Sequence, residues 1–267
     1  MSDYDFRFGG IARLYGREGL ARLRAAHVMV VGVGGVGSWI VEALARSGIG
    51  ALTLVDFDEA CVSNVNRQLH ALDGAIGRAK ADLMAERARA IQPECRVTSL
   101  LEFFTADNAQ RLLGLDGSSR RPAFVVDAID NVANKVLLLA LCRANAIPVV
   151  TCGGAGGRRD ATLVRVADIT QVTHDRLISE VRKRLRQEHG FPREGKKFGI
   201  DAVFSAEPQV FPQEDGSVCV NRVDAKEGES LRLNCDWGFG SATFVTGTFG
   251  FAAAGVVVRK IADSPAS

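Results

Sequence analysis

The feature that most constrains this fold is a glycine-rich turn between an apolar strand and a helix. Residues 28–31 are all apolar, residues 32–37 read Gly-Val-Gly-Gly-Val-Gly, and an apolar helical pattern follows from Trp39. Asp56 ends a second apolar run nineteen residues after Gly37. In such an arrangement, backbone N–H groups and the positive end of a helix face bound phosphates, and the acidic side chain takes ribose hydroxyls. The spacing predicts a nucleotide site; the alternative is a tight turn without a ligand.

Alternating strand and helix patterns continue from residue 25 to about residue 150. Short apolar runs, typical of strands buried on both faces, lie near Val28–Gly32, Ala51–Asp56, Arg96–Leu101, Ala123–Asp127 and Pro148–Thr151. Helical patterns fall between them, near residues 38–47, 78–91, 106–113 and 132–145. This order predicts an α/β fold, a doubly wound, Rossmann-like and mostly parallel sheet. A C-terminal extension of strands and helices follows it.

We expect three consecutive regions within one compact domain. Residues 1–24 are predicted to form an N-terminal helical arm, and residues 25–155 the Rossmann-like nucleotide-binding domain. A glycine-rich loop at 153–157 marks a change of character, and residues 156–267 are expected to complete the sheet. A chain of 267 residues that is 47% hydrophobic has ample material for one large core.

Charge and cysteine usage exclude several classes of protein. The net charge is +2, so no global field implies nucleic-acid binding, and any such role must come from a local patch. Six cysteines form no C-x-x-C pair, so a four-thiolate zinc site is not expected. The first residues are polar and acidic, unlike a secretory signal, and we expect a cytoplasmic protein with reduced thiols.

Residues 237–258 contain no charged side chain, and their length would suffice to cross a membrane. The segment includes five glycines and several serine and threonine residues, so its hydrophobicity is modest. We expect a buried helix of small residues packed under the sheet, because a core helix can be apolar all round. Membrane association through 237–258 is the alternative.

Charged residues fall at the predicted ends of the strands. The carboxyl ends of parallel strands open on one crevice, so these side chains should converge. An arginine and a lysine beside a glycine turn favour a polyphosphate, and carboxylates there favour Mg²⁺. The alternative is an ordinary surface network of ion pairs. The residues concerned are Asp56, Asp58, Asp127, Asp130, Arg67 and Lys80.

Five ordered motifs together resemble the ubiquitin-activating-enzyme-like superfamily over residues 7–155. They are Gly32-x-Gly-Gly-x-Gly37, Asp56-Phe-Asp58, Ser63-Asn-x-Asn-Arg-Gln68, Gly77-x-x-Lys80 and Asp127-x-x-Asp130-Asn131. Members of this superfamily use ATP and Mg²⁺ to adenylate a carboxylate. The resemblance implies catalytic roles for Arg67, Lys80 and Asp130, with Mg²⁺ held by Asp130 through ATP. The ATP-binding set that it implies is Gly32, Gly34, Gly35, Gly37, Asp56, Asp58, Asn64, Arg67, Lys80, Asp127 and Asn131.

Three further segments resemble one family within that superfamily, the tRNA threonylcarbamoyladenosine dehydratases. These are residues 7–16, 151–157 and 236–243, so the likeness covers essentially the whole chain. The resemblance implies a ligase-type enzyme whose substrate is tRNA carrying N6-threonylcarbamoyladenosine beside the anticodon. ATP activates the threonyl carboxylate, and a nitrogen of the same side chain then displaces AMP and closes a ring. The superfamily also implies a homodimer.

Two departures from the superfamily pattern matter. Relatives that activate sulfur-carrier proteins usually carry two C-x-x-C pairs for zinc, and their absence here argues against a ubiquitin-like protein tail as substrate. Relatives also often place an arginine where Gly10 stands, as a finger that reaches the ATP of the partner subunit. Arg7 or Arg13 would have to serve instead, and we assign Arg13, acting in trans.

A local basic patch is predicted between residues 174 and 197, which carry eight positive and four negative side chains. A run of charge on a helix is usually only its solvated face. Together with the family resemblance, this run favours contact with an RNA phosphate backbone. The residues expected to contact tRNA are Arg182, Lys183, Arg184, Arg186, Lys196 and Lys197.

The sequence leaves two other functions open. The first is a sulfur-carrier or ubiquitin-like protein adenylyltransferase, or a sulfur-relay protein, with Cys235 as a possible reactive thiol. A cysteine desulfurase or sulfur acceptor would then be its partner, although a buried cysteine is more often simply a small apolar residue. The second is an NAD-dependent oxidoreductase, in which Arg67 and Lys80 would lack a role.

Overall fold

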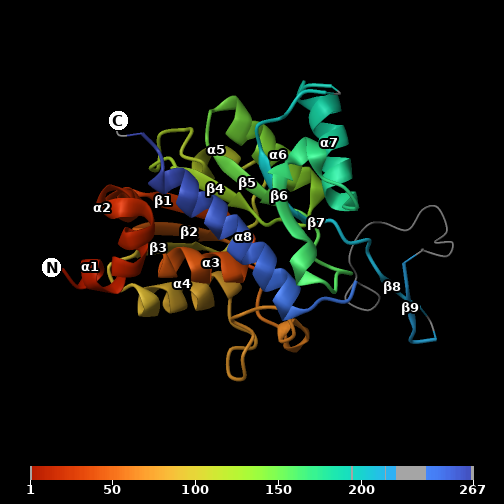
Figure 1. The fold of residues 1–267 in the computed structure, drawn as a ribbon, viewed down its shortest axis with the longest axis horizontal. Coiled ribbons are helices and arrows are strands. Elements are labelled where there is room, and N and C mark those ends of the chain that lie inside the picture. The colour runs from red at the N-terminus through yellow and green to blue at the C-terminus, as the bar shows by residue number, and fades with distance from the viewer. Residues whose placement is uncertain (1, 194, 214, 221–238, 266–267) are drawn as a thin grey trace.

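The apolar runs of the first half of the chain form adjacent strands of a single sheet. The computed structural model describes residues 2–193, 195–213, 215–220 and 239–265. Its seven-stranded sheet has the order β3-β2-β1-β4-β5-β7-β6, in which β6 alone runs antiparallel (Figure 1). The prediction of a doubly wound, mostly parallel sheet is confirmed. The strands are β1 His27–Val31, β2 Ala51–Val55, β3 Arg96–Leu100, β4 Phe124–Asp127, β5 Val149–Cys152, β6 Val164–Asp168 and β7 Asp201–Ser205.

Helices cover both faces of this sheet, and alternate strand residues point to one face or the other. Val30 lies in the core beneath α3, α4 and α8, whereas its neighbour Met29 lies in the core beneath α5, α6 and α7. Burial on both faces explains why the strand segments are apolar without alternation. The helices are α1 Asp3–Arg7, α2 Gly9–Ala25, α3 Gly37–Arg46, α4 Lys80–Ile91, α5 Ala109–Leu112, α6 Val132–Ala144, α7 Arg176–Glu188 and α8 Thr243–Ala262.

The second half of the chain extends the same sheet. β7 continues the parallel order beside β5, and β6 pairs with β7 through Val164–Ser205 to Asp168–Asp201. The chain after the glycine-rich loop enters the sheet at β6, Val164–Asp168. Beyond β7 the chain forms a small hairpin, β8 Phe211–Pro212 and β9 Val218–Cys219. The regions on either side of residue 156 therefore share one sheet.

The apolar segment near the C-terminus forms α8, which packs against α2, α3 and the strands β5 to β7 (Figure 1). Phe249, Ala253 and Val257 are fully buried. A Cβ atom on Gly250 would lie 2.6 Å from the Cβ atom of Trp39, so this glycine permits the close approach of α3 and α8. By length and hydropathy α8 could cross a membrane, but it is mostly buried within the protein. The prediction of a core helix of small residues is confirmed, with its start at residue 243.

The candidate site lies where the parallel strands end and the following helices begin. α3 starts after β1, α4 follows the long loop after β2, and α6 starts after β4. Their N-terminal ends therefore meet the carboxyl ends of the strands at one edge of the sheet. Because helix N-termini carry unpaired N–H groups and partial positive charge, this edge suits an anion. We call it the carboxyl edge.

Candidate active site

The four glycines of the turn after β1 play two different structural parts. Gly32 has a φ of 89°, and a Cβ atom on it would lie 2.7 Å from the carbonyl oxygen of Ala128. A Cβ atom on Gly37 would overlap the carbonyl oxygen of Gly32. A Cβ atom on Gly34 or Gly35 would come no closer than 3.5 Å to any atom of the described residues beyond its chain neighbours, so the fold itself leaves space beside them. A phosphate that approaches the backbone closely would use that space.

Asp56 connects the end of β2 to the glycine turn. Its Oδ2 accepts a hydrogen bond from the Val33 amide at 2.6 Å, and its Oδ1 accepts one from the Asp58 amide at 2.9 Å. Burial raises the pKa of Asp56, while the bonds from Val33 and Asp58 oppose that rise. The carboxylate thus holds the turn against the second strand, next to the position expected for a ribose.

Lys80 is the first residue of α4, and its ammonium group lies at the carboxyl edge. Its Nζ lies 2.8 Å from Asp58 Oδ2, and its side chain is 8% exposed where that of Asp58 is 53% exposed. A positive side chain at a helix N-terminus is unfavourable for the helix dipole. A further anion beside Lys80, such as a phosphate, would offset this repulsion.

Arg67 lies beside the glycine turn, and two distant elements hold its backbone. Its side-chain Cγ would be 3.5 Å from a Cβ atom on Gly35, and its Nη1 donates to the carbonyl oxygen of Ser63 at 2.7 Å. The backbone carbonyl of Arg67 accepts bonds from Trp39 Nε1 at 3.1 Å and Thr246 Oγ1 at 3.3 Å. Sequence reasoning missed Trp39 and Thr246, because neither belongs to a local motif that includes Arg67.

Asn64 is buried, and its side chain serves the loop that carries Arg67. Its Oδ1 accepts a hydrogen bond from the Cys61 amide at 3.1 Å, which caps the short turn Val62–Asn64. Asn66 contacts a distant segment instead: its Nδ2 donates to the carbonyl oxygen of Ser241 at 2.9 Å. The loop is therefore clamped between its own turn and the residues that precede α8.

Asp127, at the tip of β4, is completely buried in an ion pair with Lys135 of α6. Its Oδ2 lies 2.9 Å from Lys135 Nζ and accepts a bond from Thr151 Oγ1 at 2.6 Å. Lys135 also donates to the carbonyl oxygen of Ile129 at 2.9 Å. Both side chains are 0% exposed, so Asp127 supports the loop after β4 from the core and does not face solvent. Lys135 was missed, although its place in the apolar pattern of α6, next to Val136, was a signal.

The loop above that ion pair carries Asp130 and Asn131, both exposed at the carboxyl edge. The side chain of Asn131 caps α6 by accepting a bond from the Asn134 amide at 3.1 Å. In the described part of the chain, no group of three or more His, Cys, Asp or Glu residues could hold a metal ion. Mg²⁺ itself is commonly bound through one or two carboxylates and the phosphates of a substrate.

Two buried side chains near the turn lack hydrogen-bond partners in the described structure. Both ring nitrogens of His70 and Oε1 of Gln68 are unpaired there. Burial, aided by the positive charge of Lys80, lowers the pKa of His70 to about 4, so its ring is neutral at pH 7. Gln68 Nε2 would be 3.8 Å from a Cβ atom on Gly34, which places this amide at the glycine turn. The sequence pattern assigned neither residue a role.

The cations predicted to contact tRNA have different surroundings in the structure. Arg182 donates to the carbonyl oxygens of Ile169, Thr170 and Val172, so it binds the protein's own backbone. Within α7, Lys183 pairs with Glu180 and Arg184 with Glu188, and Arg186 lies over the ring of Phe198. Lys196 and Lys197 are exposed in the loop that follows.

Of the cysteines near the site loops, Cys152 is buried and Cys61 is exposed. Burial raises the pKa of the Cys152 thiol to about 12, so it is not a reactive thiolate at neutral pH. Cys235, the predicted reactive thiol, lies outside the described residues.

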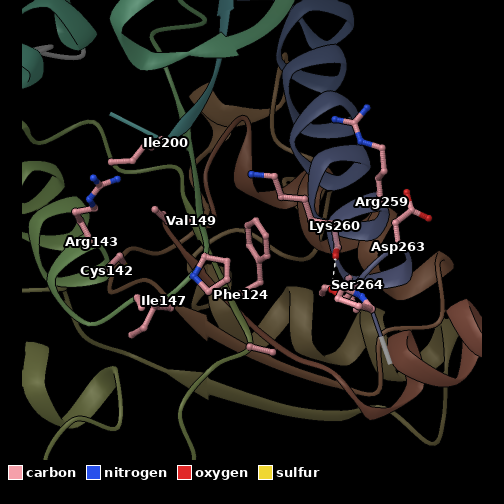
Figure 2. Close-up of a pocket in the computed structure, with 16 residues that line it drawn as sticks. Phe124, Cys142, Arg143, Ile147, Val149, Ile200, Arg259, Lys260, Asp263 and Ser264 are labelled. Atoms are coloured by element: carbon pink, nitrogen blue, oxygen red, sulfur yellow. Dashed lines mark hydrogen bonds between the residues drawn. The ribbon is translucent and has the colours of Figure 1, made fainter. Parts of the chain in front are cut away.

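A cavity of about 690 Å³ lies at the opposite edge of the sheet, where β4 and β5 begin. Figure 2 shows it around Phe124, with Arg143 of α6 on one side and Lys260 of α8 on the other. Lys260 Nζ lies 2.6 Å from Asp201 Oδ2, so its charge is already paired. None of the predicted nucleotide-binding residues lines this cavity.

Comparisons with known proteins agree with this geometry. The model of the ThiF family matches residues 10–263. The tRNA threonylcarbamoyladenosine dehydratase of Escherichia coli is 50% identical over 96% of this chain and 93% of its own length. The enzyme of that name from Haemophilus influenzae is 47% identical over 98% of this chain and 95% of its own. A molybdopterin-synthase adenylyltransferase from Salmonella typhimurium is 33% identical over 53% of this chain and 54% of its own.

Solved structures also show similarity to the dehydratases. The crystal structure of the E. coli tRNA N6-threonylcarbamoyladenosine dehydratase in complex with ATP has a TM-score of 0.84 to this chain and 45% sequence identity. The match covers 97% of this chain and 96% of the other. The structure of the same enzyme with AMP has a TM-score of 0.83.

Proposed function

The chain belongs to the ThiF family, and on that premise we propose that it is an ATP-dependent tRNA threonylcarbamoyladenosine dehydratase. One observation carries the proposal. The likeness to dehydratases covers nearly the entire chain, including α7 and α8, whereas the adenylyltransferase of molybdopterin synthase matches only about half. The adenylyltransferase therefore shares only part of this chain, and the remainder would distinguish the substrate.

The proposed site binds ATP at the carboxyl edge. The triphosphate lies over Gly34 and Gly35, where the fold leaves room, with Arg67 and Lys80 beside it. Asp56 faces the ribose. Arg67 and Lys80 are held in place before ATP arrives, by the bonds to the Arg67 carbonyl and by Asp58. Positively charged groups fixed in this way stabilise the charge that develops on the α-phosphate.

The proposed reaction has two steps. In the first, a carboxylate oxygen of the threonyl group attacks the α-phosphorus of ATP, and the bond to pyrophosphate breaks. In the second, a nitrogen of the same side chain attacks the activated acyl carbon and loses its proton. The ring closes as AMP leaves with the former carboxylate oxygen, so the substrate has lost the elements of water. Holding the reactants in line contributes several kcal/mol, roughly 7–11 at best.

Asp130 fits the part of a Mg²⁺ ligand, because it is exposed on the loop that Lys135 and Asp127 hold from below. When bound, the ion would neutralise phosphate charge. Asp127 is committed to Lys135 and Thr151, so its proposed part is to position the loop that carries Asp130.

We also propose a homodimer in which Arg13 reaches the ATP of the partner subunit. Arg7 is engaged by Asp3 at 2.6 Å, whereas the Arg13 guanidinium lies over Gly9 and Gly10. It would be 3.9 Å from a Cβ atom on Gly10, close to the place that relatives give to their arginine. This geometry favours Arg13 over Arg7 as the finger.

The test is chemical analysis of the tRNA. Purified protein with ATP, Mg²⁺ and tRNA bearing N6-threonylcarbamoyladenosine should yield the cyclised nucleoside and AMP, both measured by mass spectrometry. Cells that lack the protein, expected to work in the cytoplasm, should lose the cyclised nucleoside. Absence of ring closure in the complete reaction would overturn the proposal. Alkylation of the thiols separates a sulfur relay through Cys235 and a desulfurase partner, because only a relay requires a free thiol.

A further inference from the structure

A second cavity, of about 520 Å³, opens at the N-terminus of α7. We call it the α7 pocket. It is lined by residues just before α7, by the first turns of α7 and by the segment after β7, among them His174, Arg176, Gln209 and Phe211. A hydrogen bond connects the lining of this pocket to the strand β5, beside the candidate active site. Asp175 Oδ2 accepts a bond from the Gly154 amide at 2.8 Å, and this glycine follows β5. β5 pairs with β4 in the register Asp127–Thr151, so the pocket and the phosphate site share the carboxyl edge.

The side chains that line the α7 pocket carry a net positive charge, because two arginines accompany one aspartate. The N-terminus of the 13-residue helix α7 faces it, and Arg176 and Arg182 line it. The lining acid, Asp175, already accepts bonds from the amides of Gly154 and Ile178. A pocket with this charge suits a phosphate.

Directly behind the wall lies Arg158, a guanidinium that is only 2% exposed. Its Nη2 donates to the carbonyl oxygen of His174, a residue of the wall. Its Nε and Nη1 have no hydrogen-bond partner within the described structure. A buried donor without a partner is costly, so an anion entering the pocket would be stabilised by this charge.

The pocket also contains an aromatic surface. The guanidinium of Arg176 lies 5.5 Å from the centre of the Phe211 ring, and the centre of the Phe239 ring lies 5.1 Å from that of Phe211. Phe211 is only partly buried, so its ring is accessible from the cavity. Aromatic rings and arginine planes beside phosphate-binding cations are how proteins hold unpaired nucleotides.

We propose that the α7 pocket binds one unpaired nucleotide of the substrate tRNA, with its base against Phe211 and its phosphate towards Arg176, Arg158 and the N-terminus of α7. This inference rests on the proposed function, because it assumes a tRNA substrate. The pocket would hold the anticodon loop so that the modified adenosine reaches the ATP site along the same edge.

The test measures binding of an anticodon stem-loop RNA to the full-length protein as a function of salt. Phe211→Leu removes the ring but keeps apolar volume, and should weaken binding about 5- to 140-fold, the effect of losing one base–ring stack, without changing the salt slope. Arg176→Ala should weaken binding and reduce the log–log salt slope by roughly 0.7–1. Phe211→Tyr should bind like the wild type. Phe6→Leu and Arg120→Ala, at exposed residues that do not line the pocket, are the matched controls.

The affinity for ATP without RNA should stay unchanged in every variant, which shows that the fold and phosphate site are intact. If Phe211→Leu binds RNA like its control, no base stacks in the pocket and the proposal is overturned. If only Arg176→Ala has an effect, the pocket holds an anion alone, which also overturns it. If the wild-type protein binds ATP but neither binds nor cyclises the tRNA, the proposed function has failed rather than this inference.

Discussion

At the scale of single residues, the four turn glycines serve different ends and should respond differently to substitution. Gly37→Ala should prevent stable folding, because its Cβ atom would overlap the Gly32 carbonyl oxygen. Gly34→Ala should fold normally, since its Cβ atom would come no closer to the protein than 3.8 Å. We expect it to lose ATP affinity instead. Thermal unfolding and ATP titration of both variants check this, and an equal loss of stability would contradict it.

Arg67 and Lys80 are expected to act on the transition state rather than on the fold. Arg67→Ala and Lys80→Ala should each lower the rate of AMP formation about 100- to 1,000-fold, the effect of removing one preorganised donor. Single-turnover kinetics measures this decrease, and Arg96→Ala on the edge strand β3 is the control. Turnover at the wild-type rate in either variant would remove that side chain from the phosphate site.

His70 should make the protein acid-sensitive. In the unfolded chain its ring takes up a proton near its ordinary pKa of 6.5, whereas burial lowers the pKa in the folded protein to about 4. The unfolded state therefore binds more protons between these values, and stability is lost as the pH falls from 6.5 to 4. The difference amounts to about 3 kcal/mol. His70→Gln should flatten this part of a plot of melting temperature against pH, and the exposed His189→Gln should not.

At the scale of elements, the cations on and after α7 have two roles: Arg182 stabilises the fold, whereas the lysines face solvent. Arg182 binds three backbone carbonyls, so Arg182→Ala should lower the free energy of unfolding by about 1.5–3 kcal/mol. Replacing Lys183, Lys196 and Lys197 by Ala should leave stability unchanged and reduce the salt slope of tRNA binding, by roughly 0.7 for each phosphate that is no longer neutralised. Urea unfolding and filter binding measure the two effects. An Arg182→Ala protein of wild-type stability would contradict the division.

At the scale of the whole molecule, the proposed homodimer predicts complementation between inactive chains. Arg13→Ala and Arg67→Ala should each be inactive alone. In an equal mixture that exchanges subunits, random pairing of a two-fold dimer restores one intact site in four, or about 25% of wild-type activity. Size-exclusion chromatography with light scattering establishes the dimer independently. A mixture as inactive as its components would exclude Arg13 from the partner's site.

The sequence by itself determined the strands, the helices and the glycine turn, because these depend on spacing between near neighbours. It also placed Asp56, Arg67, Lys80 and Asp130 at one edge, since parallel strands bring their carboxyl ends together. Partners distant in the chain were decided only by the tertiary structure. Thr246 reaches the Arg67 carbonyl across 179 residues, Asp127 is buried beneath its loop by Lys135, and Arg182 turns inward to bind backbone. The physical reason is that a local pattern specifies which face of an element is apolar, but not which distant polar group will meet a buried charge on that face.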